Sequence, residues 1–262
     1  PFAVISDKAN NRKYPIADYS LTPTVAIVDP ALVLTVPGFV AADTGMDVLT
    51  HATEAYVSQM ASDYTDGLAL QAIKLVFENL ESSVKNADFH SREKMHNAST
   101  IAGMAFANAF LGISHSMAHK IGAQFHTVHG RTNAILLPYV IRYNGTRPAK
   151  TATWPKYNYY RADEKYQDIA RMLGLPASTP EEGVASYAKA VYELGERVGI
   201  EMNFKAQGVD EKEWKEHSRE LAFLAYEDQC SPANPRLPMV DHMQEIIEDA
   251  YYGYKERPGR RK

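Results

Sequence analysis

The sequence predicts a mainly α-helical protein with a short α/β segment at its N-terminus. Two β-branched runs near the start, Phe2–Ser6 and Thr24–Asp29, predict strands on either side of a polar stretch. After Pro30 apolar residues recur at helical spacing as far as the C-terminus. With 262 residues, 45% of them hydrophobic, the chain can bury a core as one large or two small domains.

Helical periodicity and local breaks predict the elements that follow. Ser91 before a charged turn is typical of a helix cap, Gly112 should end that helix, and the Pro-, Tyr- and Lys-rich stretch Thr146–Tyr160 predicts a loop. That loop is either a functional excursion or a plain surface insertion. The predicted helices are Asp43–Met60, Tyr64–Val84, Ser91–Phe110, Asn133–Tyr143, Ala162–Leu173, Pro180–Gly199, Glu211–Tyr226 and Val240–Tyr254.

Composition excludes several classes of function. The net charge is −4, so we expect no nucleic-acid partner, and the basic tail Arg257–Lys262 is expected to be a solvated terminus. The longest apolar stretch, Ile101–Ile113, is too short for a membrane span. The single cysteine, Cys230, forms no internal disulfide, which fits a reducing compartment such as the cytoplasm. Because the chain opens at Pro1 without a methionine, we expect a fragment.

Clustered histidines are the main chemical signal. Asp47 precedes His51 by four residues, a spacing that places both side chains on one helix face. One carboxylate with several imidazoles is a ligand set for a divalent transition metal, although single histidines more often only pack or form hydrogen bonds. Four of the nine histidines fall in one short run, SHSMAHKIGAQFHTVHG: His115, His119, His126 and His129.

A common metal site would require the chain to turn between His115 and His129. A straight helix would separate these two residues by about 21 Å, because each residue rises about 1.5 Å. Ligands lie only about 2 Å from their ion. Gly122 and Gly130 are candidate breaks, and Thr127 could cap a following helix.

Four segments together resemble the iron-containing (group III) alcohol dehydrogenases: GMDVLTHATEAYVS, AGMAFANAFLGISHSMAHKIGAQFHTVHG, NAILLPYVIRYN and CSPANPR. The stretches FAVISDKANNRKYPIADYSLTP and PKYNYYRADEKYQDIAR are most similar to the alcohol dehydrogenase half of bacterial bifunctional aldehyde-alcohol dehydrogenases. The resemblance covers nearly the whole chain. It implies the helical C-terminal domain of the dehydroquinate synthase-like, iron alcohol dehydrogenase fold.

The resemblance also implies residue roles. His119 would lie near the nicotinamide and the substrate as the catalytic proton relay, Lys13 near the cofactor, and Phe106 and Cys230 beside the substrate pocket. His126 receives no role and is expected to pack. The metal ligands would be Asp47, His51, His115 and His129.

Two departures from the family pattern stand out. The glycine-rich phosphate loop of the family's nucleotide-binding half is absent, and no GxGxxG is present. Residues 1–30 are therefore expected to be a remnant of that α/β domain, and residues 31–262 to form the helical metal-binding catalytic domain. Val128 stands where the family often has proline before the last ligand.

The implied function is that of an NAD(H)-dependent alcohol dehydrogenase for a short-chain primary alcohol, such as ethanol, and its aldehyde, acetaldehyde. A divalent ion would act as a Lewis acid on the alcohol oxygen, and hydride would pass to the nicotinamide. The ligand types suit Fe(II) or Zn(II), and the resemblance favours Fe(II). It also implies a homo-oligomer that forms filaments in the full-length protein.

Two other functions remain open from the residues alone. In a metallohydrolase the metal would activate water, and Glu54, three residues after His51, could be the general base. In a non-catalytic assembly module, the Tyr-rich segment Trp154–Tyr160 would mediate contacts.

Overall fold

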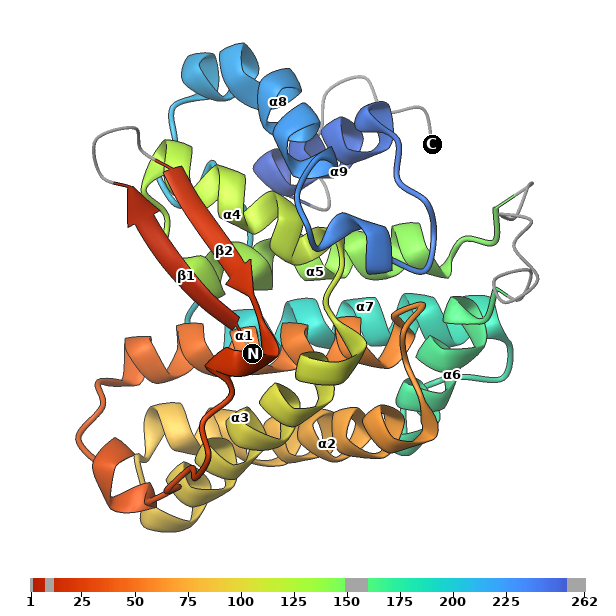
Figure 1. Cartoon of the computed structure of the whole chain (residues 1–262). Coiled ribbons are helices and arrows are strands. Elements are labelled where there is room, and N and C mark those ends of the chain that lie inside the picture. Colours follow the sequence, from red (N-terminus) through yellow and green to blue (C-terminus); the bar gives the residue numbers. More distant parts are fainter. Residues whose placement is uncertain (1, 8–11, 149–159, 254–262) are drawn as a thin grey trace.

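The predicted helical fold is confirmed. The computed structural model describes residues 2–7, 12–148 and 160–253, and helices dominate it (Figure 1). The first helices are α1 (Gly38–Val57), α2 (Asp63–Lys85), α3 (Phe89–Ala109), α4 (Ile113–Phe125) and α5 (His129–Gly145). They are followed by α6 (Ala162–Met172), α7 (Pro180–Arg197), α8 (Glu211–Tyr226) and α9 (Val240–Tyr252).

The helices bury two apolar clusters that share α5. The first cluster is formed mainly by α1, α2, α3, α6 and α7, and the second by α4, α8 and α9. Helix α5 contributes Ala134 and Leu137 to the first cluster and Ile135 and Leu136 to the second. A helix that is apolar on opposite faces is stable only when it is buried between other elements. Helix α5 therefore joins the two halves of the domain.

Caps explain where several helices begin. Ser62 and Thr65 form a reciprocal capping box at α2, and Asp210 accepts hydrogen bonds from two amides at the start of α8. The sequence predicted Ser91 as the N-cap of α3, and this prediction is wrong. Asp88 takes that position and accepts a hydrogen bond from the Ser91 amide, since a carboxylate three residues upstream reaches the free N–H groups.

The N-terminal strands differ from the prediction. Strands β1 (Phe2–Asp7) and β2 (Arg12–Ala17) form an antiparallel pair that crosses in front of α4 (Figure 1). The predicted strand Thr24–Asp29 is wrong, because these residues find no pairing partner within the described ranges. Ile27 is 87% exposed. A β-branched pattern favours a strand only where another strand supplies the hydrogen bonds.

The required turn between α4 and α5 is present, but neither glycine makes it. Gly122 lies inside α4 and Gly130 inside α5. The break falls at His126, which adopts the left-handed conformation with φ of 56°. Thr127 provides no side-chain cap for α5, whose N-cap is Val128. The predicted break at Gly112, by contrast, is confirmed.

No single helix in the described part of the chain is long and apolar enough to cross a membrane. The pair α3 and α4 reaches the required length and composition only when both helices are taken together, across a bend of 107°. Most of the predicted loop Thr146–Tyr160, including Trp154, lies outside the described residues, and so does the whole basic tail Arg257–Lys262.

Candidate metal centre

Three helices bring the four predicted ligands together. Helix α1 carries Asp47 and His51 one turn apart, α4 carries His115, and His129 is the first residue of α5. Asp47 Oδ1 lies 3.6 Å from His115 Nε2 and 3.8 Å from His129 Nε2. Ligand atoms of Asp47, His51 and His115 all fall within 4.8 Å of one another. These separations suit side chains arranged around one ion.

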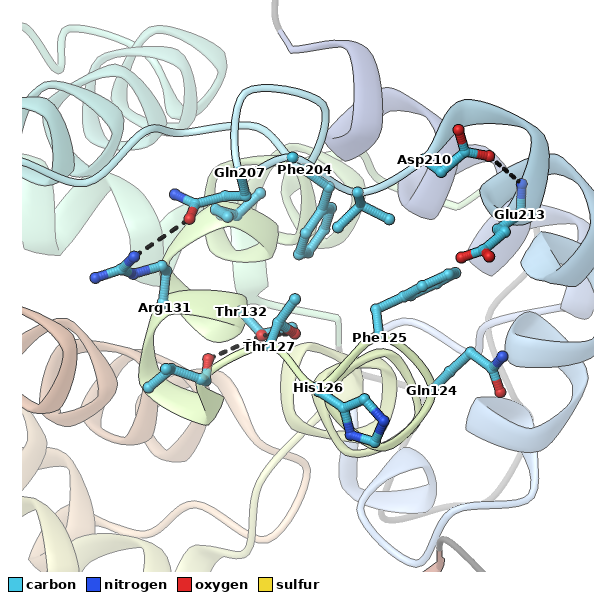
Figure 2. Close-up of a pocket in the computed structure, with 14 residues that line it drawn as sticks. Gln124, Phe125, His126, Thr127, Arg131, Thr132, Phe204, Gln207, Asp210 and Glu213 are labelled. Carbon is cyan, nitrogen blue, oxygen red and sulfur yellow. Dashed lines mark hydrogen bonds between the residues drawn. The ribbon is translucent and has the colours of Figure 1, made fainter.

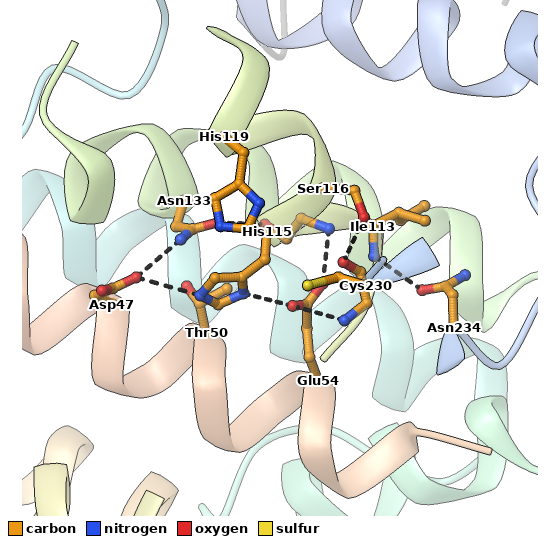
Figure 3. Close-up of polar contacts among 12 residues, drawn as sticks. Asp47, Thr50, Glu54, Ile113, His115, Ser116, His119, Asn133, Cys230 and Asn234 are labelled. Atoms are coloured by element: carbon orange, nitrogen blue, oxygen red, sulfur yellow. Dashed lines mark hydrogen bonds and ion pairs between the residues drawn. The ribbon is translucent and has the colours of Figure 1, made fainter. Parts of the chain in front are cut away.

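The ring of His115 gives the strongest sign that the cluster fits a cation. Its Nδ1 is hydrogen-bonded to Glu54 (Figure 3). Its Nε2 is buried and has no hydrogen-bond partner, and its one drawn interaction is the ion pair with Asp47 Oδ1 at 3.6 Å. A buried polar atom without a partner is rare and needs an explanation. This atom faces the Asp47 carboxylate, so a metal ion between them would satisfy both groups.

The pKa shifts describe a site that requires positive charge. Burial lowers the pKa of His51 to about 4 despite the nearby Asp47, so His51 is a neutral donor at pH 7. Burial alone would also lower the pKa of His115, but the carboxylates of Asp47 and Glu54 outweigh it and raise that pKa to about 9. Burial opposes ionisation of Asp47 as well, yet the surrounding histidines hold its pKa well below the usual range. A divalent ion would supply the same positive charge.

His119 lies beside this centre in a separate group. Its ring is stacked on that of His129, with centroids 5.4 Å apart, and its Nδ1 is 3.2 Å from Asp228 Oδ2. Lys120 places its ammonium group 2.8 Å from the same carboxylate oxygen. Burial would raise the pKa of Asp228, but His119 and Lys120 together lower it well below the usual range. The hydrogen bond to Asp228 thus uses Nδ1 of His119 and leaves the other ring nitrogen, Nε2, outside this contact.

Cys230 also lies in this group, within 4.8 Å of the His119 and Asp228 ligand atoms. It is buried, and its amide donates to Asp228. Burial raises the pKa of the thiol far above the ordinary value, so it stays protonated. A protonated thiol beside an ammonium group is a poor metal site. Of the two groups, the Asp47 cluster is therefore the better candidate for a metal centre.

The remaining predicted site residues are placed as follows. Phe106 is stacked on His51, with ring centroids 4.6 Å apart, and its other contacts include Phe2 of β1. It therefore lies directly against a predicted ligand. Lys13 belongs to β2, but its side chain lies outside the described part of the structure.

Two polar residues at the centre were not predicted in their observed roles. Glu54 accepts hydrogen bonds from the amides of Gly112 and Ser114 and is 2.6 Å from His115 Nδ1. Asn133 donates to Asp47 Oδ1 at 2.8 Å. The spacing from His51 places Glu54 on the correct helix face, but nothing in the sequence indicates which groups it meets.

Close contact between α1 and α5 fixes the distance between Asp47 and His129. A Cβ atom at Gly130 would lie 2.2 Å from the Asp43 carbonyl oxygen and 3.1 Å from Asp47 Cβ. The absence of a side chain at Gly130 lets the helices approach. Arg131 reinforces the contact with hydrogen bonds to both Asp43 carboxylate oxygens.

A cavity of about 450 Å³ lies on the other side of the α4–α5 turn, between that turn and the segment before α8 (Figure 2). Arg131 and Gln207 are hydrogen-bonded on its wall. None of the four candidate ligands lines it. His126 does line it and is exposed, so the expectation that His126 packs is wrong. Its role in the structure is to end α4 in the left-handed conformation.

The fold and this centre define a helical domain with a candidate carboxylate–imidazole metal site. Residues 41–251 match the model of the Fe-containing alcohol dehydrogenase family, C-terminal, and the chain belongs to that family. It is 97% identical over 262 residues to the aldehyde-alcohol dehydrogenase of Streptococcus pneumoniae, covering all of this chain and 30% of that protein.

Two solved structures share the fold. The iron-containing alcohol dehydrogenase of Thermococcus thioreducens matches with a TM-score of 0.83 and 34% identity, over 97% of this chain and 61% of that one. Sulfoacetaldehyde reductase from Bifidobacterium kashiwanohense, in complex with NAD⁺, matches with a TM-score of 0.78 and 27% identity, over 95% of this chain and 60% of that one. The chain thus spans less than two thirds of each of these relatives.

Proposed function

We propose that this chain is the metal-binding catalytic half of an NAD(H)-dependent dehydrogenase that interconverts a short-chain primary alcohol, ethanol, and its aldehyde. The observation that carries the proposal is the buried Nε2 of His115, which has no hydrogen-bond partner and lies among Asp47, His51 and His129. Family membership supports the type of reaction. The similarity to the S. pneumoniae aldehyde-alcohol dehydrogenase supports the further proposal that this chain is part of a bifunctional aldehyde-alcohol dehydrogenase.

The described residues divide the chemistry between them. A divalent ion held by Asp47, His51, His115 and His129 supplies Lewis acidity toward an alcohol or aldehyde oxygen. Asp228 holds His119 through Nδ1, and Lys120 pairs with the same carboxylate oxygen of Asp228. Since its Nδ1 faces Asp228, His119 has Nε2 free to exchange the hydroxyl proton of the substrate. Phe106 covers one face of the His51 ring.

The geometry of Glu54 disfavours the metallohydrolase alternative. A general base needs a carboxylate free to take a proton from water. Both oxygens of Glu54 instead accept backbone hydrogen bonds, and the side chain is only 3% exposed. We therefore expect the S. pneumoniae relative to oxidise ethanol with NAD⁺ and to leave simple esters intact. Ester hydrolysis without ethanol oxidation would overturn the proposal.

We propose Fe(II) as the resident metal, with Zn(II) as the competing ion for the same ligands. The test is elemental analysis of anaerobically purified chain, followed by reconstitution with each metal. One equivalent of iron that restores ethanol oxidation in the relative supports the assignment. Activity restored by zinc and not by iron would reverse it.

Replacing His119 with alanine should separate catalysis from metal binding. In the relative, the equivalent change is expected to lower kcat by about 10²- to 10⁴-fold, the range that a positioned acid–base group contributes. The metal content should stay at the wild-type value, because His119 is not one of the four ligands. Steady-state kinetics and elemental analysis on the same preparation measure both effects. A parallel loss of metal would contradict the relay role.

The isolated chain is expected to bind metal and to bind NAD⁺ weakly, with little dehydrogenase activity. The reason is that the described residues before α1 form a short strand pair and short 3-10 helices, and residues 1–30 contain no glycine-rich phosphate loop. Isothermal titration with NAD⁺, beside the same measurement on the S. pneumoniae relative, tests this expectation. Equal affinity in the two proteins would show that the helical domain alone suffices.

A further inference from the structure

Glu54 occupies a position that connects a candidate ligand to the start of a helix. The side chain rises from α1 to the N-terminus of α4, where it meets two backbone amides and the ring of His115 (Figure 3). The distances are 3.0 Å to the Gly112 nitrogen, 2.7 Å to the Ser114 nitrogen and 2.6 Å to His115 Nδ1.

These contacts fix which nitrogen of His115 carries the proton. Backbone amides can only donate, so Glu54 is placed as an acceptor at the positive end of the α4 dipole. When the ring is neutral, as a metal ligand must be, an acceptor opposite Nδ1 favours the tautomer with the proton on Nδ1. Nε2 then keeps its lone pair, and it is this atom that is buried without a hydrogen-bond partner and faces Asp47.

The chain around Gly112 is shaped to admit Glu54. A Cβ atom at Gly112 would lie 2.9 Å from Glu54 Oε1 and 2.8 Å from Asn234 Oδ1. The backbone of Gly112 has φ of −142°, an ordinary extended value, so glycine is needed there for space and not for conformation. Two features therefore allow the carboxylate to reach α4: the position of Glu54 on α1 and the missing side chain at Gly112.

We propose that Glu54 is the positioning residue for the metal ligand His115: it sets the tautomer and orientation of the ring and thereby raises the affinity of the centre for a divalent ion. The proposal rests on the proposed metal site. Carboxylates that hydrogen-bond the second nitrogen of a metal-bound histidine raise its basicity and fix its direction, and their removal typically weakens metal binding by about 10- to 100-fold.

A chelator competition with Co(II) as the probe tests this role in the 262-residue chain. Glu54→Gln keeps the volume but places an amide NH₂ where at least one of the three donors points. It is expected to weaken Co(II) binding by roughly 10- to 100-fold and to change the visible absorption of bound Co(II), which reports ligand geometry. Glu54→Asp, which keeps the charge but shortens the reach, should weaken binding in the same direction.

Asn234 offers a matched control at the same helix end. Its Oδ1 lies 3.4 Å from the Ile113 nitrogen and the residue is buried, but no described contact joins it to His115. Asn234→Ala should therefore lower the melting temperature while Co(II) affinity, measured well below that temperature, stays close to the wild-type value.

The outcomes separate the two proposals. Failure of the wild-type chain to bind Co(II) would remove the metal site itself. Wild-type binding with unchanged affinity in both Glu54 variants would overturn the positioning role alone. Equal losses of affinity in Glu54→Gln and Asn234→Ala would also overturn it, by reducing Glu54 to a helix cap.

Discussion

Replacing His115 with alanine is expected to abolish metal binding by the chain. The substitution removes the one candidate ligand whose coordinating atom is buried without a hydrogen-bond partner. It also removes the imidazole ring that both the Asp47 and the Glu54 carboxylates contact, and so leaves a space between two negative charges. The loss of affinity should exceed the 100-fold or so that marks the upper end for residues outside the ligand set. Ethanol oxidation by the S. pneumoniae relative should fall to background with the equivalent change.

His126→Asn is the matched control for this experiment. His126 is a histidine eleven residues further along the chain, exposed and not among the four ligands. Asparagine tolerates the left-handed conformation that this position requires. The control should bind metal as the wild type does. Full metal occupancy in His115→Ala, measured by elemental analysis, would contradict the assignment of the centre.

Gly130→Ala is expected to damage both stability and the metal site. The new methyl group would meet the Asp43 carbonyl oxygen at 2.2 Å, and backbone atoms of two packed helices cannot yield without moving the helices. Overpacking of this kind costs about 1–3 kcal/mol of unfolding free energy. Moving α5 away from α1 also separates His129 from Asp47, so the affinity for Co(II) should fall as well. Urea unfolding and chelator competition measure the two effects.

The control for this substitution is Gly103→Ala in α3. A Cβ atom at Gly103 would meet nothing within 4 Å. Alanine in a helix interior is favoured over glycine by up to about 1 kcal/mol, so this variant should be as stable as the wild type or more so. Gly130→Ala with wild-type stability and wild-type metal affinity would refute the claim that this glycine sets the spacing of the helices.

That the four candidate ligands lie close together could be predicted, because the family resemblance singled them out and the local spacing agrees with it. Asp47 and His51 share one helical turn, and the separation of His115 from His129 demands a bend if they meet. The position of the bend could not be predicted, because the residue that takes the left-handed conformation is His126 and not a glycine. The glycine that looked like a break, Gly130, instead permits a contact between helices that no local pattern encodes.

Hydrogen-bond partners that lie far apart in the sequence could not be predicted either, because no local pattern encodes contacts between helices. Asp228 is 109 residues from His119, and Glu54 is 61 residues from His115. The spacing from His51 predicted the helix face of Glu54 correctly, but it also suggested a carboxylate free to act as a general base. In the structure both carboxylate oxygens accept hydrogen bonds from amides at the start of α4. The strand prediction at Thr24–Asp29 failed because these residues pair with no strand among the described residues, although their β-branched pattern favours one.

The sharing of α5 between the two apolar clusters has a consequence for cooperativity. Asp47 and His51 belong to the helix at the centre of the first cluster, His115 to a helix of the second, and His129 to the helix common to both. An ion held by all four therefore acts as a crosslink between two halves that could otherwise loosen separately. Because binding to the native state alone stabilises it by mass action, metal would raise the stability of both halves together. The bound form should then unfold in a single transition.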